Sequence, residues 1–272
     1  MDGLIDIEWA EKISGILNKY RRRHGAAKLE RVQECFLMAM GRMAGRIPNA
    51  EQRSKIYFSG LTDEPWPQTD GIEAISILEA NYEVIKEELL SVLKLKNGFQ
   101  PYIVEGDGLY ANDWNVYYFK NQKLRFEENR VNCPQTARII ESLPQLGETA
   151  MFSALNPKCR IEPHYGTWNV RLTVHLGLII PQPCAIRVGG QTRTWEEGKC
   201  LVFDDSFRHE AWNDSDRTRF ILFVDVWHPN LAPAEIDVLD EISQVISTEE
   251  LKAVQIIERN KDALLNKRWW SF

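Results

Sequence analysis

Residues His164–Pro229 decide the fold, and they read HYGTWNVRLTVHLGLIIPQPCAIRVGGQTRTWEEGKCLVFDDSFRHEAWNDSDRTRFILFVDVWHP. The segments LTVHLGLII (172–180) and FILFVDVW (220–227) alternate or run apolar and contain many β-branched residues, a pattern that predicts strands. Turn-forming residues interrupt the stretch at four places: Pro181–Pro183, Gly189–Gly190, Glu197–Gly198 and Asn213–Asp214. Short strands at this spacing predict an antiparallel sandwich or barrel with a small mouth.

Three histidines lie within this stretch: His164, His175 and His209. His164 follows a proline near a predicted strand start, and His209 comes just after an acidic turn. Two imidazoles this far apart in sequence can meet only across a folded sheet, where they suit a metal ion. Each histidine considered singly is more simply interpreted as an ordinary hydrogen-bonded residue.

Four motifs in the stretch resemble one enzyme family. HLGLIIP, TWEEGK, FDDSFRHEAWN and FVDVWHP follow one another in the order seen in the aspartyl/asparaginyl β-hydroxylases, which are iron(II)- and 2-oxoglutarate-dependent oxygenases. Upstream, IYFSGLTDEPWPQ resembles the family's entry motif, and GETAMFSALNPKCRIEPH resembles the strand leading to its first iron ligand. The resemblance covers residues 56–231 and leaves both ends of the chain outside it.

The resemblance implies a mainly β fold with flanking helices, whose core is a double-stranded β-helix, a jelly-roll or cupin-like barrel. We expect an N-terminal helical extension packed on the core (1–55), an oxygenase domain (56–231) and a C-terminal helical segment (232–272). Apolar spacing predicts helices at 7–22 and 27–46, one long helix between Thr69–Asp70 and Asn97–Gly98, a short helix from Pro134 to Leu143, one from Pro233, and a last one at 248–266. Residues 112–119 are predicted to form a strand.

The metal ligands implied by the resemblance are His164 and His209. Non-haem iron(II) sites commonly use two histidines and one carboxylate, usually in the local pattern His-x-Asp/Glu. Here the residue two past His164 is Gly166, which offers no ligand atom. The family also has glycine at this place and is understood to work with two histidines, so the departure from the wider superfamily agrees with the resemblance. We interpret Asp204 and Asp205 as turn-forming residues.

The co-substrate implied by the resemblance is 2-oxoglutarate. Its keto-acid end is expected to chelate the metal, and its distal carboxylate needs a charge-assisted partner, for which arginine suits better than lysine. Arg219 matches the family's arginine for that end, and Ser153 matches its co-substrate serine. His175 matches a further histidine near the co-substrate, with a satisfied core histidine as an equal alternative. Arg171 matches a second arginine of the family pattern, and we count it among the cofactor-binding residues.

The predicted activity is hydroxylation of a C–H bond, expected at a β-carbon, with Fe(II), 2-oxoglutarate and O2. Thr173 stands where the family has an arginine used towards the substrate, which weakens the case for an aspartyl or asparaginyl residue. We therefore expect an amino acid or an amino-acid-derived small molecule, used in biosynthesis. Two alternatives stay open: a halogenase or other oxidative tailoring enzyme on the same scaffold, and a non-catalytic protein that binds metal and 2-oxoglutarate.

Composition limits the partners and the compartment. The chain has 272 residues, 44% hydrophobic and 26% charged, with a net charge of −6, which argues against nucleic acid as a partner. No run of about eighteen apolar residues predicts a membrane helix, and the acidic N-terminus lacks the features of a signal peptide. Five cysteines without CxxC spacing indicate reduced thiols and a cytoplasmic protein. The N-terminal helices are expected to form a lid or a homodimer surface, and His228 is expected to be structural.

Overall fold

The computed structural model describes residues 7–43, 49–54, 56–95, 98–104, 108–109 and 113–246. Its helices are α1 (Ile7–His24), the 3₁₀ turn η1 (Ala26–Leu29), α2 (Glu30–Ala39), α3 (Glu73–Ala80), α4 (Tyr82–Val92), α5 (Glu127–Asn132), α6 (Pro134–Ser142) and α7 (Pro233–Ile246). Its strands are β1 (Gln100–Pro101), β2 (Ile103–Val104), β3 (Gly108–Leu109), β4 (Trp114–Asn121), β5 (Leu124–Arg125), β6 (Leu146–Leu155), β7 (Cys159–His164), β8 (Arg171–Ile179), β9 (Cys184–Val188), β10 (Gln191–Arg193), β11 (Cys200–Phe203), β12 (His209–Asn213) and β13 (Arg219–Trp227).

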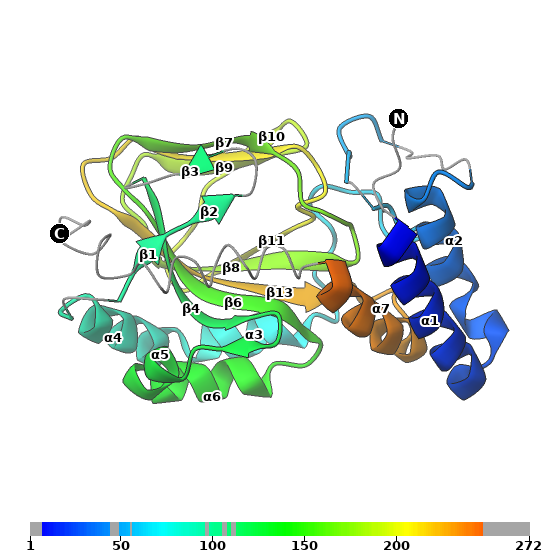
Figure 1. Ribbon diagram of the computed structural model, residues 1–272. Helices are drawn as coiled ribbons and strands as arrows, with labels where there is room; N and C mark the ends of the chain where they lie inside the picture. Colours follow the sequence, from blue (N-terminus) through cyan, green and yellow to red (C-terminus); the bar gives the residue numbers. More distant parts are fainter. Residues whose placement is uncertain are drawn as a thin grey trace.

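Two antiparallel sheets face each other, and Figure 1 shows the smaller one above the larger one. The larger sheet has the strand order β1-β4-β6-β13-β8-β11, and the smaller has the order β10-β9-β12-β7. From β6 onward the chain passes back and forth between them, because β6, β8, β11 and β13 lie in the larger sheet and β7, β9, β10 and β12 in the smaller. This alternation defines a double-stranded β-helix, so the predicted fold class is confirmed.

The two faces of the larger sheet contact different parts of the protein. Alternate residues of β13 point to opposite faces because side chains alternate along a strand. Phe220, Leu222 and Val224 belong to the apolar cluster shared with helices α3, α4 and α6, which cover the outer face in Figure 1. The intervening residues, Arg219, Ile221, Phe223 and Asp225, therefore face the smaller sheet. The strands thus place polar side chains in the space between the sheets.

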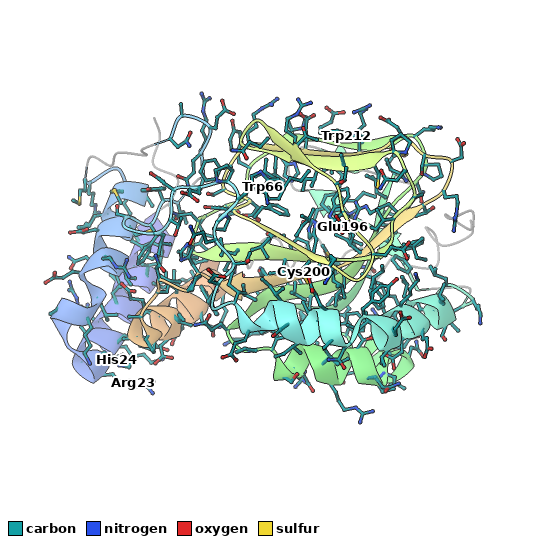
Figure 2. The ribbon with its side chains drawn as sticks, turned by 180° about the vertical axis from the view of Figure 1, so that it is seen from behind. Arg23, His24, Trp66, Glu196, Cys200 and Trp212 are labelled. Carbon is teal, nitrogen blue, oxygen red and sulfur yellow. The ribbon has the colours of Figure 1, made fainter. Side chains whose placement is uncertain are left out.

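A second apolar cluster joins the two ends of the described chain. Helices α1, α2 and α7 lie side by side at one end of the sheets (Figure 1) and bury residues such as Ile13, Phe36 and Val238. Arg31 of α2 forms an ion pair with the buried Glu235 of α7 at 2.6 Å. The basic residues near the end of α1 lie far from the sheets, as Arg23 and His24 show in Figure 2. These residues form the last turn of α1, where cations are favoured by the helix dipole.

The helices differ from the predictions in three places, one of which is the unpredicted helix α5. The predicted long helix is two helices, α3 and α4, which are separated at Asn81, where the side-chain amide donates to the Ile77 carbonyl at 2.8 Å. An asparagine competes for backbone hydrogen bonds in this way, and apolar spacing alone does not reveal it. Of the predicted helix 27–46, the residues up to Ala39 are helical and residues 40–43 form turns and bends. Residues 44–46 and the predicted helix 248–266 lie outside the described residues.

Two further sequence expectations concern the membrane and the thiols. No helix in the described part of the chain has both the length and the apolar character that a membrane span requires. All five cysteines lie in that part, and none of them is paired in a disulfide. The cytoplasmic location and the homodimer stay predictions.

Candidate metal and co-substrate site

A cavity of about 690 Å³ lies between the two sheets. Its walls come from β6, β8 and β13 of the larger sheet and from β7, β9 and β12 of the smaller one, together with the loop that follows His164. Every site residue predicted from the sequence lines this one cavity: Ser153, His164, Arg171, His175, His209 and Arg219. The fold therefore brings together residues that are up to 66 positions apart (219 − 153) in the sequence.

His164 and His209 face each other across adjacent strands. They are register partners on β7 and β12, and their ring centroids are 4.0 Å apart. Each ring is oriented through Nδ1, which lies 2.7 Å from the Glu162 carbonyl in His164 and 2.9 Å from the Phe207 carbonyl in His209. A histidine that donates its Nδ1 hydrogen to a carbonyl presents Nε2 as the ligand atom, as metal-binding histidines commonly do.

Burial affects the charge state of His209. Burial lowers the pKa of His209 to about 4, although its contacts with backbone groups oppose this shift. The ring is therefore neutral at pH 7, and neutral imidazole is the form that binds a metal. Within the described residues, no cluster of three or more histidine, cysteine, aspartate or glutamate side chains is arranged to hold a metal.

Gly166 and Asp205 share the space beside this pair. A Cβ added to Gly166 would lie 2.3 Å from Oδ1 of Asp205, so the Asp205 carboxylate occupies the place where a side chain at 166 would project. The amide of Gly166 also donates to the Asp205 carbonyl at 2.7 Å. Asp204 does form the expected turn, because its Oδ1 accepts from the Ser206 amide at 2.9 Å. For Asp205 the turn interpretation was incomplete, since its side chain also lines the cavity.

Arg219 lies at one end of the cavity as a buried cation. It is 1% exposed, and its Nε and Nη1 atoms are buried without a hydrogen-bond partner. The guanidinium lies over the Trp195 ring at 4.8 Å. Burial lowers the pKa of Arg219 to about 10, with no carboxylate among the causes, so it stays charged at pH 7. A buried cation without an acid partner is costly, and an anionic ligand would relieve that cost.

Ser153 and His175 lie near this arginine. The Ser153 hydroxyl accepts a hydrogen bond from Nε1 of Trp114 at 2.9 Å, so its own hydrogen can be donated elsewhere. Nδ1 of His175 accepts from Nε1 of Trp195 at 3.3 Å, which assigns the remaining hydrogen to Nε2. Burial, with Arg219 and His209 adding to it, lowers the pKa of His175 well below the ordinary value. His175 is therefore both a satisfied, buried histidine and a cavity residue.

Arg171 lines the same cavity in a different setting. Its Nη1 contacts the Glu148 carboxylate, and its Nε lies 3.3 Å from Oδ2 of Asp225. The Trp168 and Trp227 rings lie 5.3 and 5.7 Å from its guanidinium carbon. The two carboxylates raise the pKa of Arg171 against the effect of burial. The charge of Arg171 is thus already compensated by protein groups.

Sequence reasoning missed Glu148, Asp225 and the two indoles of Trp114 and Trp195. Period-two alternation along β13 would have put Asp225 on the same face as Arg219, because they are six positions apart. Glu148 gave no comparable signal, since its contact with Arg171 depends on strand pairing. His228, predicted to be structural, is buried outside the cavity lining, and its Nδ1 accepts from the Asn230 amide at 3.1 Å.

The fold and the cavity define a jelly-roll protein with an internal, histidine-lined site. The chain belongs to the aspartyl/asparaginyl β-hydroxylase family, whose model matches residues 79–229. It is 38% identical over 207 residues to the human protein named aspartyl/asparaginyl beta-hydroxylase, an alignment that spans 72% of this chain and 27% of that protein. This chain therefore corresponds to about a quarter of the human relative.

Two further relatives differ in how much of them is matched. The aspartate beta-hydroxylase domain-containing protein 2 of Xenopus tropicalis is 31% identical over 242 residues, 85% of this chain and 65% of its own length. The Rhizobium tropici protein named ornithine lipid ester-linked acyl 2-hydroxylase is 38% identical over 203 residues, 72% of each chain. All three relatives are named as hydroxylases or as proteins that contain a hydroxylase domain.

Proposed function

We propose that this protein is an iron(II)- and 2-oxoglutarate-dependent dioxygenase that hydroxylates a C–H bond of an amino acid or an amino-acid-derived small molecule. The observation that carries the proposal is the placement of two different binding features in one cavity. The facing pair His164 and His209 suits a divalent metal, and the unpaired Arg219 suits a carboxylate. A keto acid with a second carboxylate would occupy both features, because its keto-acid group would chelate the metal and its second carboxylate would bind Arg219.

The histidine pair fits iron(II) through its donor chemistry. Imidazole nitrogen is a common ligand for this ion, and both rings are held through Nδ1 so that Nε2 would be the ligand atom. Two neutral ligands leave the charge of the ion uncompensated, and the dianion of 2-oxoglutarate would balance it. The Asp205 carboxylate beside Gly166 supplies a further negative charge next to the pair without being the usual third ligand.

The Arg219 end fits the distal carboxylate of 2-oxoglutarate. The orphaned Nε and Nη1 donors of Arg219, the Ser153 hydroxyl and Nε2–H of His175 are the donors that would hold it. Trp114 and Trp195 fix the orientation of Ser153 and His175 by their own hydrogen bonds. When bound, iron and 2-oxoglutarate supply the oxygen activation that C–H hydroxylation needs. The protein residues orient the co-substrate and exclude water.

The substrate would enter on the other side of the histidine pair, where Arg171, Thr173 and Asp225 line the cavity. The printed names of the relatives cover two substrate types, an aspartyl or asparaginyl side chain and an acyl chain of an ornithine lipid. Thr173 is uncharged and buried, so it supplies no counter-charge for a substrate carboxylate. This supports a substrate other than an aspartyl residue.

Halogenation is less well supported than hydroxylation. A halide ligand would need the space beside Gly166, and the Asp205 carboxylate fills that space with a negative charge. Chloride next to a buried carboxylate is disfavoured by like-charge repulsion. The product should accordingly be heavier by one oxygen, and activity should not depend on added chloride.

The proposal is tested by anaerobic titration with iron(II) and 2-oxoglutarate. The wild-type protein should develop the metal-to-ligand charge-transfer band of a chelated keto acid. His164→Ala and His209→Ala should each abolish the band and the formation of succinate, because one remaining imidazole does not hold the ion. His24→Ala is a matched control, because this histidine lies on α1 and pairs with Asp237 of α7, outside the cavity lining. A wild-type band in either ligand variant would refute the assignment.

A further inference from the structure

The cavity has a second charged end, opposite Arg219. The larger sheet carries a row of cavity-facing residues along β13 that runs from Arg219 through Phe223 to Asp225. At about 3.3 Å per residue, the two charged residues are separated by roughly 20 Å along the strand. Thr173 of β8 is the register partner of Asp225, and Thr149 of β6 donates its amide to Asp225 Oδ1 at 2.9 Å.

The histidine pair lies between these two ends. On one side, Arg219 lies over Trp195, which donates to His175, and the Phe203 ring lies between His175 and His209 at 4.9 and 5.9 Å from their rings. On the other side, Gly166, two residues past His164, lies against Asp205, and Arg171 contacts Asp225. The order along the cavity is therefore the Arg219 end, the histidine pair, and then the end formed by Asp225 and Arg171.

Arg171 already contacts carboxylates of the protein itself. Carboxylates contact two of its nitrogens, and indole rings lie near its guanidinium. A substrate carboxylate arriving here would compete with Glu148 and Asp225 for the same donors. It would also approach Asp205, which lines the same part of the cavity, and like charges at this distance repel.

Negative charge exceeds positive charge at this end. In the cavity lining, Asp225 and Asp205 face the single guanidinium of Arg171. Glu148 of β6 and Lys120 of β4 lie outside the lining and carry opposite charges, so they do not change this excess. Oε1 of Glu148 and Nη1 of Arg171 are both buried without a hydrogen-bond partner.

The other cation of the cavity lining is Arg53. It is exposed, and its Nε donates to the Ala50 carbonyl at 3.2 Å. A charge at a solvated rim is screened by water and salt, so it contributes little to selecting a buried substrate group.

We infer that the substrate carries a protonated amine or a guanidinium that lies against Asp225. This inference rests on the proposed function, because it assigns the opposite end of the cavity to 2-oxoglutarate. A buried ammonium or guanidinium would form charge-assisted hydrogen bonds with Asp225 and offset the surplus negative charge. Asp225 thereby determines specificity, while Arg171 positions it.

The test uses three amino acids whose side chains are similar in length and differ in charge: L-ornithine, L-glutamine and L-glutamate. Each is added to the protein loaded anaerobically with iron(II) and 2-oxoglutarate, and the perturbation of the charge-transfer band reports binding. L-Ornithine should bind at least about tenfold more tightly than L-glutamate, with L-glutamine between them. Succinate release on admitting oxygen should follow the same order.

Asp225→Asn should weaken L-ornithine binding by roughly ten- to hundredfold and change L-glutamine binding little. Asp240→Asn is the matched control, because Asp240 lies on the exposed side of α7, interacts electrostatically with Glu148 and Arg171, and does not line the cavity. It should retain the wild-type preference for L-ornithine.

The possible failures are distinguishable. If no charge-transfer band forms, the proposed function fails and the inference fails with it. If the band forms but L-glutamate binds as well as L-ornithine, or L-ornithine gives no response, the inference alone is refuted. The preference of the wild-type protein for L-ornithine over L-glutamate does not depend on any variant. It therefore tests the inference even if the Asp225 variant does not fold.

Discussion

Arg219 and Arg171 are two arginines of one cavity, and their surroundings differ. Both lie over tryptophan rings, Arg219 over Trp195 and Arg171 near Trp168 and Trp227. Arg219 has buried donors without partners, and burial lowers its pKa to about 10. Arg171 contacts two carboxylates, which raise its pKa.

The difference in surroundings indicates which of the two arginines binds a ligand. A buried cation without a counter-ion costs free energy of folding, so its retention is explained by an anion that binds in the functional state. A cation held between two buried carboxylates stabilises the fold and sets the local charge. The same residue type therefore binds the co-substrate at one end and shapes the substrate end at the other.

The largest expected effect is on the stability of Arg171→Met. Removing this guanidinium leaves Glu148 and Asp225 buried without their counter-ion, which should lower the free energy of unfolding by about 3–5 kcal/mol. Urea unfolding without ligands measures it. Arg187→Met is the control, because that arginine pairs with Glu210 on the exposed face of the smaller sheet and should cost less than about 1 kcal/mol. Equal losses of unfolding free energy in the two variants would show that Arg171 is not the counter-ion of Glu148 and Asp225.

Arg219→Met should behave in the opposite way. Without ligands its free energy of unfolding should be unchanged or higher than that of the wild type, because an uncompensated buried charge is removed. Its affinity for 2-oxoglutarate should fall by roughly ten- to hundredfold, the loss expected for a charge-assisted contact. Calorimetric titration of the manganese(II)-loaded protein measures the affinity. Loss of several kcal/mol of stability with unaltered affinity would assign Arg219 a structural role instead.

A smaller effect is expected at Gly166, between the two ends. Gly166→Asp forces a second carboxylate into the space of Asp205, and two like charges there should reduce turnover by about tenfold or more while the metal still binds. Gly166→Asp combined with Asp205→Gly moves the carboxylate instead of doubling it, and should recover part of the lost activity. Gly166→Ala separates the steric effect from the charge. Full activity in Gly166→Asp would show that the Asp205 carboxylate does not exclude a side chain at position 166.

Much of the fold could be predicted from local patterns, and the confirmed parts show why. The strands that frame the cavity, such as β8 and β13, have apolar alternation and turn residues at their ends, and both signals are local in sequence. The break at Asn81 was missed because a side-chain hydrogen bond, not the apolar spacing, separates α3 from α4.

For the site, the family motifs placed His164, His209 and Arg219, and the structure puts all three in one cavity. The compensation of Arg171 could not be predicted, because it depends on the register of three strands. The overlap of Gly166 with Asp205 could not be predicted either, because it depends on two loops that are 39 residues apart (205 − 166) in the sequence.

The most direct test of the central claim is a crystal structure of the protein soaked with manganese(II) and 2-oxoglutarate, with the metal located by anomalous scattering. One metal ion should be bound by Nε2 of His164 and Nε2 of His209, and the distal carboxylate should lie on Nε and Nη1 of Arg219. Arg171 should keep its contacts with Glu148 and Asp225. A distal carboxylate bound to Arg171, or a metal ion away from the histidine pair, would contradict the account.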